Sequence, residues 1–206
     1  MYEKKPMAIE YKSMDIIDES LTDVSFQEKE LPVVRRMIHT TGDVEYRHII
    51  TFQGDFVDVA TKALKDGIKL YTDTKMGYQG INKPALEKSG STVSYYIDDE
   101  DVAEEAKRRE TTRSICALEK AVAEGARGFV IGNAPTALFR LLELVEEGKA
   151  DPLFVIGVPV GFVGAAESKE ALRNTSLPAV TTVGTKGGSN VAASVVNALL
   201  YMVVER

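Results

Sequence analysis

Three consecutive strand-loop-helix units in the second half of the chain constrain the fold more than any other feature. Short apolar runs at residues 128–132, 153–158 and 179–184 are each followed by a glycine- or proline-bearing loop. Helical patterns then follow, at residues 137–147, 165–173 and 190–204. Continuous apolar runs of this kind are typical of parallel strands buried on both faces. With right-handed crossovers, the sequence predicts an α/β fold, a three-layer α/β/α sandwich with a mainly parallel sheet.

The first half of the chain predicts more elements of the same kind. Strands are expected at residues 48–52, 68–72 and 92–97, and helices at residues 13–24, 31–41, 56–64 and 98–124. Ser13 is a candidate N-cap of the first helix, and Gly42 ends the second. The polar residues 73–80 are expected to form a loop, followed by a short helix capped by Asn82. We expect one domain over residues 1–206, with an N-terminal helical segment at about residues 9–41.

Composition argues against several classes of protein. The net charge of −6 argues against a nucleic-acid-binding surface. No apolar run reaches membrane-spanning length, and residues 1–6 lack a hydrophobic signal region, so we expect a cytoplasmic protein with no membrane contact. The single cysteine, Cys116, falls in a helical pattern and is expected to be a small buried hydrophobe. One cysteine and two histidines form no zinc-type ligand cluster, so no metal site is predicted.

His39 is the strongest candidate for proton transfer. It lies in the last turn of the helix predicted at residues 31–41, close to the tandem Arg35-Arg36. An imidazole gains or loses a proton near neutral pH, which suits acid-base chemistry. A histidine in this place is also favoured by the helix dipole alone, and the two arginines could form a solvated face. His48, at the start of a predicted strand, is interpreted as structural.

The predicted sheet brings its strand-to-helix loops to one edge, where α/β proteins usually bind ligands. Helices that begin after Asn133, Gly164 and Gly188 would direct backbone N–H groups there, and Lys186 adds a positive charge. Each glycine alone could simply form a tight turn. Neither a P-loop, a dinucleotide-binding pattern nor a serine nucleophile motif fits the sequence. Together, the loops favour a site for a small anionic molecule.

The chain resembles the precorrin-8X methylmutase family, including its cobalt-precorrin-8 branch. The matching stretches run in order across nearly the whole chain: Ile9-Glu10 with Ser13 and Ile16-Ile17, Arg35 to His39 with Gly42-Asp43, Thr72-Asp73 with Met76 and Gly80-Ile81, Thr112 to Ser114, Gly132 to Leu138, Pro159 to Val163 with Ala166 to Lys169, and Lys186 to Ser189. Each stretch alone is weak, but the combination is specific. The sequence departs from the family pattern at Met14, where an aromatic residue is common, and at Gly77, where a branched apolar residue is common.

The resemblance implies an isomerase of cobalamin biosynthesis. A methyl group would move from carbon 11 to carbon 12 of precorrin-8X or cobalt-precorrin-8, giving hydrogenobyrinic or cobyrinic acid. No external cofactor is implied, and any cobalt would be carried by the substrate. The family's catalytic histidine falls on His39. Its substrate-binding positions fall on Ser13, Arg36, Thr74, Met76, Arg113, Asn133, Lys186, Gly187, Gly188 and Ser189.

Similar proteins are homodimers with the ligand near the subunit interface, so a homodimer is expected here. Scattered cations and helix N-termini suit a tetrapyrrole that carries acetate and propionate arms. Two alternatives remain open at this stage. The same cationic loops could serve a tetrapyrrole-binding carrier without catalysis, and the glycine loops alone are compatible with an α/β protein that binds a phosphorylated metabolite.

Overall fold

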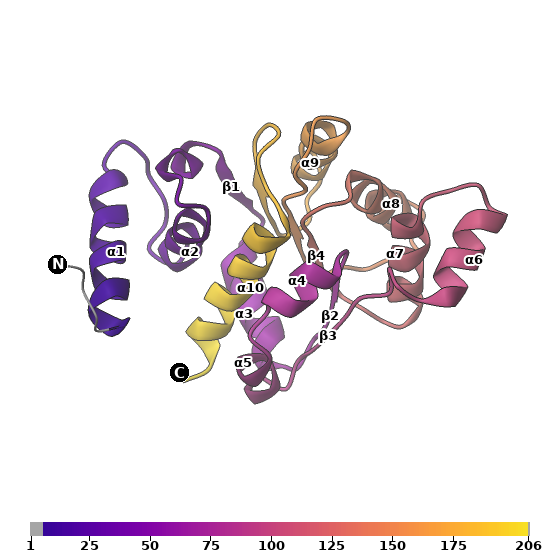
Figure 1. The fold of residues 1–206 in the computed structure, drawn as a ribbon, viewed down its shortest axis with the longest axis horizontal. Helices are drawn as coiled ribbons and strands as arrows, with labels where there is room; N and C mark the ends of the chain where they lie inside the picture. Colours follow the sequence, from indigo (N-terminus) through magenta and orange to yellow (C-terminus); the bar gives the residue numbers. More distant parts are fainter. Residues whose placement is uncertain (1–5, 206) are drawn as a thin grey trace.

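The chain folds around a six-stranded sheet (Figure 1). The structure is a computed structural model that describes residues 6–205, so the prediction for residues 1–6 falls almost entirely outside the described residues. The strands are β1 (Ile50–Gln53), β2 (Lys69–Thr72), β3 (Thr92–Ser94), β4 (Gly128–Ile131), β5 (Phe154–Gly157) and β6 (Ala179–Thr182). Their order is β1-β6-β5-β4-β2-β3, with β1 antiparallel to β6 and every other pair parallel. The predicted mainly parallel sheet is confirmed.

Helices cover both faces of this sheet. They are α1 (Pro6–Ser20), α2 (Leu31–Thr41), α3 (Phe56–Lys65), α4 (Lys75–Gly80), α5 (Lys83–Lys88), α6 (Glu100–Arg108), α7 (Arg113–Ala123), α8 (Pro135–Glu146), α9 (Ala165–Arg173) and α10 (Ser189–Val203), with a short 3₁₀ helix, η1, at Val44–His48. Side chains alternate across the strands, so Val130 joins the core under α2, α3 and α10, whereas Phe129 and Ile131 join the core under α6 to α9. The three-layer sandwich is therefore confirmed. Within residues 6–205, none of the helices has the length and apolar character needed to span a bilayer.

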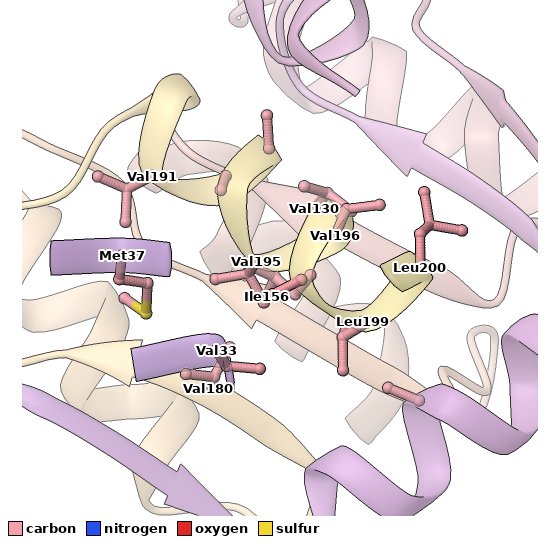
Figure 2. Close-up of a cluster of buried hydrophobic side chains, with 14 of the residues drawn as sticks. Val33, Met37, Val130, Ile156, Val180, Val191, Val195, Val196, Leu199 and Leu200 are labelled. Carbon is pink, nitrogen blue, oxygen red and sulfur yellow. The ribbon is translucent and has the colours of Figure 1, made fainter. Parts of the chain in front are cut away.

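Helix α10 is the central helix of one layer. Most of its residues are buried, because it lies between the sheet and α2 (Figure 2). Val195 and Leu199 of α10 belong to the same buried cluster as Ile156 and Val180 of the sheet and Met37 of α2. Helix α1 packs on α2 at the end of this layer, away from the sheet (Figure 1). The apolar contacts thus hold α2, the helix that carries His39, against α10.

The helix predicted at residues 98–124 is in fact two helices, α6 and α7. The chain turns at Glu110, whose φ of 52° lies in the left-handed region, and the Thr111 N–H bonds to the Ala106 carbonyl at 3.0 Å. Thr112 then caps α7, because its hydroxyl accepts the Ile115 N–H at 3.3 Å. The strong helix formers on both sides of Thr111 and Thr112 favoured the prediction of one helix.

Four further predictions were wrong about where an element lies. The first helix covers Pro6–Ser20, so Ser13 lies inside it and its hydroxyl donates to the Ile9 carbonyl at 2.8 Å instead of capping an end. The expected loop at 73–80 contains α4, capped by Thr74. The strand predicted from residue 48 begins at Ile50, because His48 belongs to η1, and the strand predicted to residue 97 ends at Ser94. The predicted Asn82 cap is confirmed: its side chain accepts the Ala85 N–H.

The strand order creates a switch point between β2 and β4. From β2 the chain steps outward to β3, whereas from β4 it proceeds in the opposite direction through β5 to β6. Open α/β sheets usually bind ligands at the carboxyl ends of strands at such a point. The residues that follow β2 and β4 therefore decide whether this place can hold a ligand.

Candidate active site

His39 lies at the exposed end of α2. The helix buries Val34, Met37 and Ile38 against the core, which leaves His39 toward solvent in the last turn. Gly42 ends the helix with a φ of 63°, and its N–H bonds to the Ile38 carbonyl at 2.9 Å. The predicted helix and its glycine stop are both confirmed. The imidazole is thereby carried on a helix that is fixed by its buried side.

The His39 cavity is a shallow hollow of about 250 Å³ between α2, α4 and α10. Its lining residues are Arg36, His39, Thr40, Gly80, Asn190, Ala193, Ser194, Asn197 and Tyr201. Gly80, at the end of α4, allows a close approach to α10, because a Cβ there would lie 2.9 Å from the Ala193 Cβ. The cavity therefore combines one imidazole and one guanidinium with several neutral hydrogen-bonding groups.

The α10 side of the cavity was missed from the sequence. Asn190, Ser194, Asn197 and Tyr201 recur at helical spacing in an otherwise apolar helix, so a polar stripe could have been recognised there. Asn197 also fixes the neighbouring turn: its amide donates to the Gly80 carbonyl at 2.9 Å and accepts the Asn82 N–H at 2.8 Å. The end of α4 is thus held in place by α10.

Arg36 lies between the His39 cavity and the N-terminal helix. Its guanidinium contacts a Glu10 carboxylate oxygen at 3.2 Å and lies over the Tyr201 ring at 5.5 Å from the centroid. It also lines two neighbouring hollows of about 360 Å³ each, between α1, α2, α5 and α10. The Arg36 charge is therefore oriented by α1 and α10 but remains at the cavity rim.

The glycine-bearing segment 186–189 packs tightly against Val158, the residue that follows β5. A Cβ at Gly187 would lie 2.1 Å from the Val158 carbonyl oxygen, and the Gly188 N–H bonds to that oxygen at 2.9 Å. The φ of Gly188 is 137°, which favours glycine. The hydroxyl groups of Ser189 and Thr74 lie 2.8 Å apart. Two predicted substrate-binding residues, Thr74 and Ser189, are therefore brought together where α4 and α10 begin.

Lys186 does not extend freely into solvent. Its ammonium forms an ion pair with Asp43 and lies 5.7 Å from the centroid of the Tyr46 ring. The hydrogen bond from Lys186 holds the pKa of the Asp43 carboxyl below its usual value. Asp43 also caps η1 by accepting the Glu45 N–H at 2.9 Å. This contact joins the glycine-bearing segment to the turn that follows His39.

Asp73 occupies the switch point of the sheet. Its carboxylate accepts the N–H groups of Gly132 at 3.0 Å, Asn133 at 2.8 Å and Ala134 at 2.7 Å. Burial raises the pKa of the Asp73 carboxyl, and these three donors oppose that rise. The expectation that the helix after Asn133 directs free N–H groups to a ligand was wrong for Asn133 and Ala134, because the Asp73 carboxylate already accepts both N–H groups. Asp73 was missed because the segment reads as a polar loop.

The other predicted site residues are dispersed. Met76 is 68% exposed on α4, the Asn133 side chain is exposed, and Ser13 lies in the middle of α1. Arg113 is the first residue of α7 and lines a separate hollow of about 520 Å³ beside α6. Neither Ser13 nor Arg113 lines the His39 cavity.

Cys116 and the histidines form no metal centre in the described part of the chain. No group of three or more His, Cys, Asp or Glu residues among residues 6–205 is placed to hold a metal ion. Cys116 is buried, as predicted, and burial raises the pKa of its thiol. His48 lies 3.5 Å from an Asp23 carboxylate oxygen on the surface.

Comparison with known proteins identifies the family. The family model described as precorrin-8X methylmutase matches residues 8–202. A cobalt-precorrin-8 methylmutase of Salmonella typhimurium is 46% identical, covering 97% of each chain, and one of Priestia megaterium is 44% identical, covering 95% of this chain and 87% of that protein. The crystal structure of a precorrin-8X methylmutase from Thermus thermophilus superposes with a TM-score of 0.88 at 36% identity over 96% of both chains. The chain therefore belongs to the precorrin-8X methylmutase family.

Proposed function

We propose that this protein moves a methyl group from carbon 11 to carbon 12 of precorrin-8X or cobalt-precorrin-8, with His39 as the proton donor and acceptor. Its relatives are methylmutases, so the chain is an isomerase of cobalamin biosynthesis. The observation that supports the role of His39 is its position: the imidazole is exposed and lines a polar cavity, whereas His48 lies against Asp23 on the surface.

The reaction requires the protein to stabilise one tautomer of the macrocycle. The bond between carbon 11 and the methyl carbon breaks as the bond to carbon 12 forms, so the product has the same atoms as the substrate. Protonation of a ring nitrogen would turn the conjugated system toward the rearranged product, and the proton then returns. An imidazole held on a rigid helix end suits both transfers, because it can donate and accept a proton near neutral pH.

Carboxylate arms of the macrocycle would be met by the charges and donors around the His39 cavity. Arg36 lies at the rim, and Asn190 and Asn197 offer neutral hydrogen bonds. The N-terminus of α10, at Ser189, adds the positive end of a helix dipole. The Lys186 ammonium can exchange the Asp43 carboxylate for a substrate carboxylate, since the two anions have the same chemistry and the Lys186–Asp43 pair is partly exposed.

The cavity is too small to enclose a tetrapyrrole alone. Sites that bury a drug-sized ligand span roughly 300–1,000 Å³, whereas the His39 cavity measures about 250 Å³. A second copy of the chain would cover the rest of the ligand, in agreement with the homodimer that the resemblance implies. It could also bring Ser13 or Arg113 to the macrocycle. The proposed enzyme is cytoplasmic and needs no external cofactor, and a central cobalt would belong to the substrate.

Visible absorbance tests this proposal directly. Purified protein is mixed anaerobically with precorrin-8X or cobalt-precorrin-8, and the spectrum is followed toward that of the rearranged corrin. We expect His39→Ala to bind the substrate and to lose about 10²- to 10⁴-fold in turnover, the usual contribution of a general acid-base group. His48→Ala is the matched control and should turn over like wild type. Equal turnover in both variants would contradict the role of His39, and binding without conversion by wild type would indicate a carrier.

A further inference from the structure

Lys169 is a charged side chain with no exposed surface, placed in α9 outside the His39 cavity. Its ammonium donates to the Lys186 carbonyl at 2.8 Å and to the Thr182 hydroxyl at 3.1 Å. The Thr182 hydroxyl in turn donates to the same Lys186 carbonyl at 2.7 Å. Two donors from different elements therefore converge on one carbonyl oxygen. Burying an ammonium is costly, so this arrangement needs a compensating contact, and the Lys186 carbonyl is that contact.

The Lys186 carbonyl lies where the chain turns from β6 toward α10. The next residue, Gly187, packs on the Val158 carbonyl so closely that no side chain would fit, and the Gly188 N–H bonds to that carbonyl. Ser189 then reaches Thr74 across the edge of the sheet. A shift of the Lys186 carbonyl would move each of these contacts, because the segment between them is only three residues long.

We infer that Lys169 is a positioning residue that fixes residues 186–189, and with them the start of α10, for binding of the substrate. Lys169 acts through the Lys186 carbonyl and does not contact the cavity itself. The same contact directs the Lys186 side chain toward Asp43, beside the end of the His39 helix. The buried ammonium of Lys169 thus holds the backbone of the glycine-bearing segment, while the Lys186 side chain links that segment to Asp43 after α2.

The test uses Lys169→Met, which keeps an unbranched side chain and removes the donor. Leu172→Ala is the matched control, because Leu172 is equally buried in α9 and its side chain lies close to Gly157 of β5. We expect Lys169→Met to speed amide hydrogen exchange at residues 187–190 by about tenfold or more, the effect of losing a charge-assisted hydrogen bond. Leu172→Ala should lower stability without a selective change at these residues.

The kinetic arm of the test rests on the proposed function. Lys169→Met should raise KM for the macrocycle by about tenfold and change kcat much less, because the lost contact aligns a binding segment. If wild type converts neither precorrin-8X nor cobalt-precorrin-8, the proposed function fails, and hydrogen exchange still decides on Lys169. If Lys169→Met changes exchange and KM no more than Leu172→Ala does, the inference is wrong.

Thr182→Val keeps the test decisive if Lys169→Met does not fold. This substitution preserves side-chain shape and removes the second donor to the Lys186 carbonyl. We expect faster exchange at residues 187–190 in the same direction, because the Thr182 hydroxyl bonds to the Lys169 ammonium as well as to the Lys186 carbonyl. Unchanged exchange in Thr182→Val would overturn the inference.

Discussion

Lys186 is ion-paired with Asp43, the residue that follows the glycine at the end of the His39 helix. The two residues are 143 positions apart in the sequence, yet they join two of the segments that carry the family resemblance. The pair is partly exposed, with about half of the Lys186 side chain accessible to solvent. Exposed ion pairs contribute little to stability. The main effect of the Lys186–Asp43 pair is therefore on the position of the Lys186 charge.

Asp43→Asn and Lys186→Met should therefore differ in their effect on binding. Asn keeps the cap of η1 and frees the Lys186 ammonium for a substrate carboxylate, so KM should stay the same or fall. Lys186→Met removes the cation and should raise KM by about tenfold. Each thermal midpoint should move by no more than about 3 °C. Steady-state kinetics with both variants decide the matter, and an equal rise of KM in the two would show that Lys186 serves only its partner Asp43.

Asp73→Ala should be among the most destabilising single changes. It would leave the buried N–H groups of Gly132, Asn133 and Ala134 without their acceptor. Unsatisfied buried donors make a loss of about 3 kcal/mol or more in the free energy of unfolding the expected result. Urea denaturation measures it, with Asp151→Ala as the control, because Asp151 is exposed and pairs with Arg127 on the surface. A loss no larger than that of the control would contradict the assigned role of Asp73.

The strands of the second half could be predicted because short continuous apolar runs, each followed by a glycine- or proline-bearing loop, are typical of buried parallel strands. The helix end at Gly42 was also predictable, since a glycine with positive φ stops a helix locally. Asp73 could not be predicted in the same way. Its burial depends on the neighbouring strand β4, 59 residues later, whose loop supplies the donors. A window of local sequence contains no sign of that distant partner.

The part of the site that depends on local sequence could also be predicted. His39 and Arg36 share a helix, so their proximity follows from helical spacing. The polar stripe of α10 could be recognised from its helical spacing. Its role in lining the His39 cavity depends on the packing of α10 beside α2, which the sequence does not show. Arg113 and Ser13 were assigned through the resemblance, and the fold of one chain does not bring them to the His39 cavity. A contribution from either residue therefore stays a prediction, tied to the proposed homodimer.

Gly77 should resist substitution, although a branched apolar residue is common there in the family. A Cβ at this position would lie 2.4 Å from the buried Thr72 hydroxyl oxygen. Gly77→Ala should therefore lower the free energy of unfolding by about 1–3 kcal/mol through overpacking, despite the better helix propensity of Ala. Thr72→Ala removes the clashing group, and the double variant should recover most of that loss. Urea denaturation of the four proteins measures the coupling; additive losses would rule out the contact as the cause.

The buried ammonium of Lys169 should give the unfolding free energy a distinctive dependence on pH. Burial, with a smaller contribution from the charge of Arg173, lowers the pKa of Lys169 from its usual 10.5 to about 8. Between these two values the unfolded chain binds more protons than the folded chain, so the contribution of this group to stability rises with pH there. Below pH 8 the group is charged in both states and contributes no slope.

Denaturant titrations from pH 7 to pH 10 can isolate this effect. The unfolding free energy of wild type should gain on that of Lys169→Met above about pH 8, since the variant lacks the group and shares every other titration. Lys62→Met is the control for the loss of a lysine, because Lys62 is exposed and paired with Asp66 on the surface of α3. Parallel curves for Lys169→Met and wild type would mean that Lys169 keeps its ordinary pKa and that its ammonium is not buried.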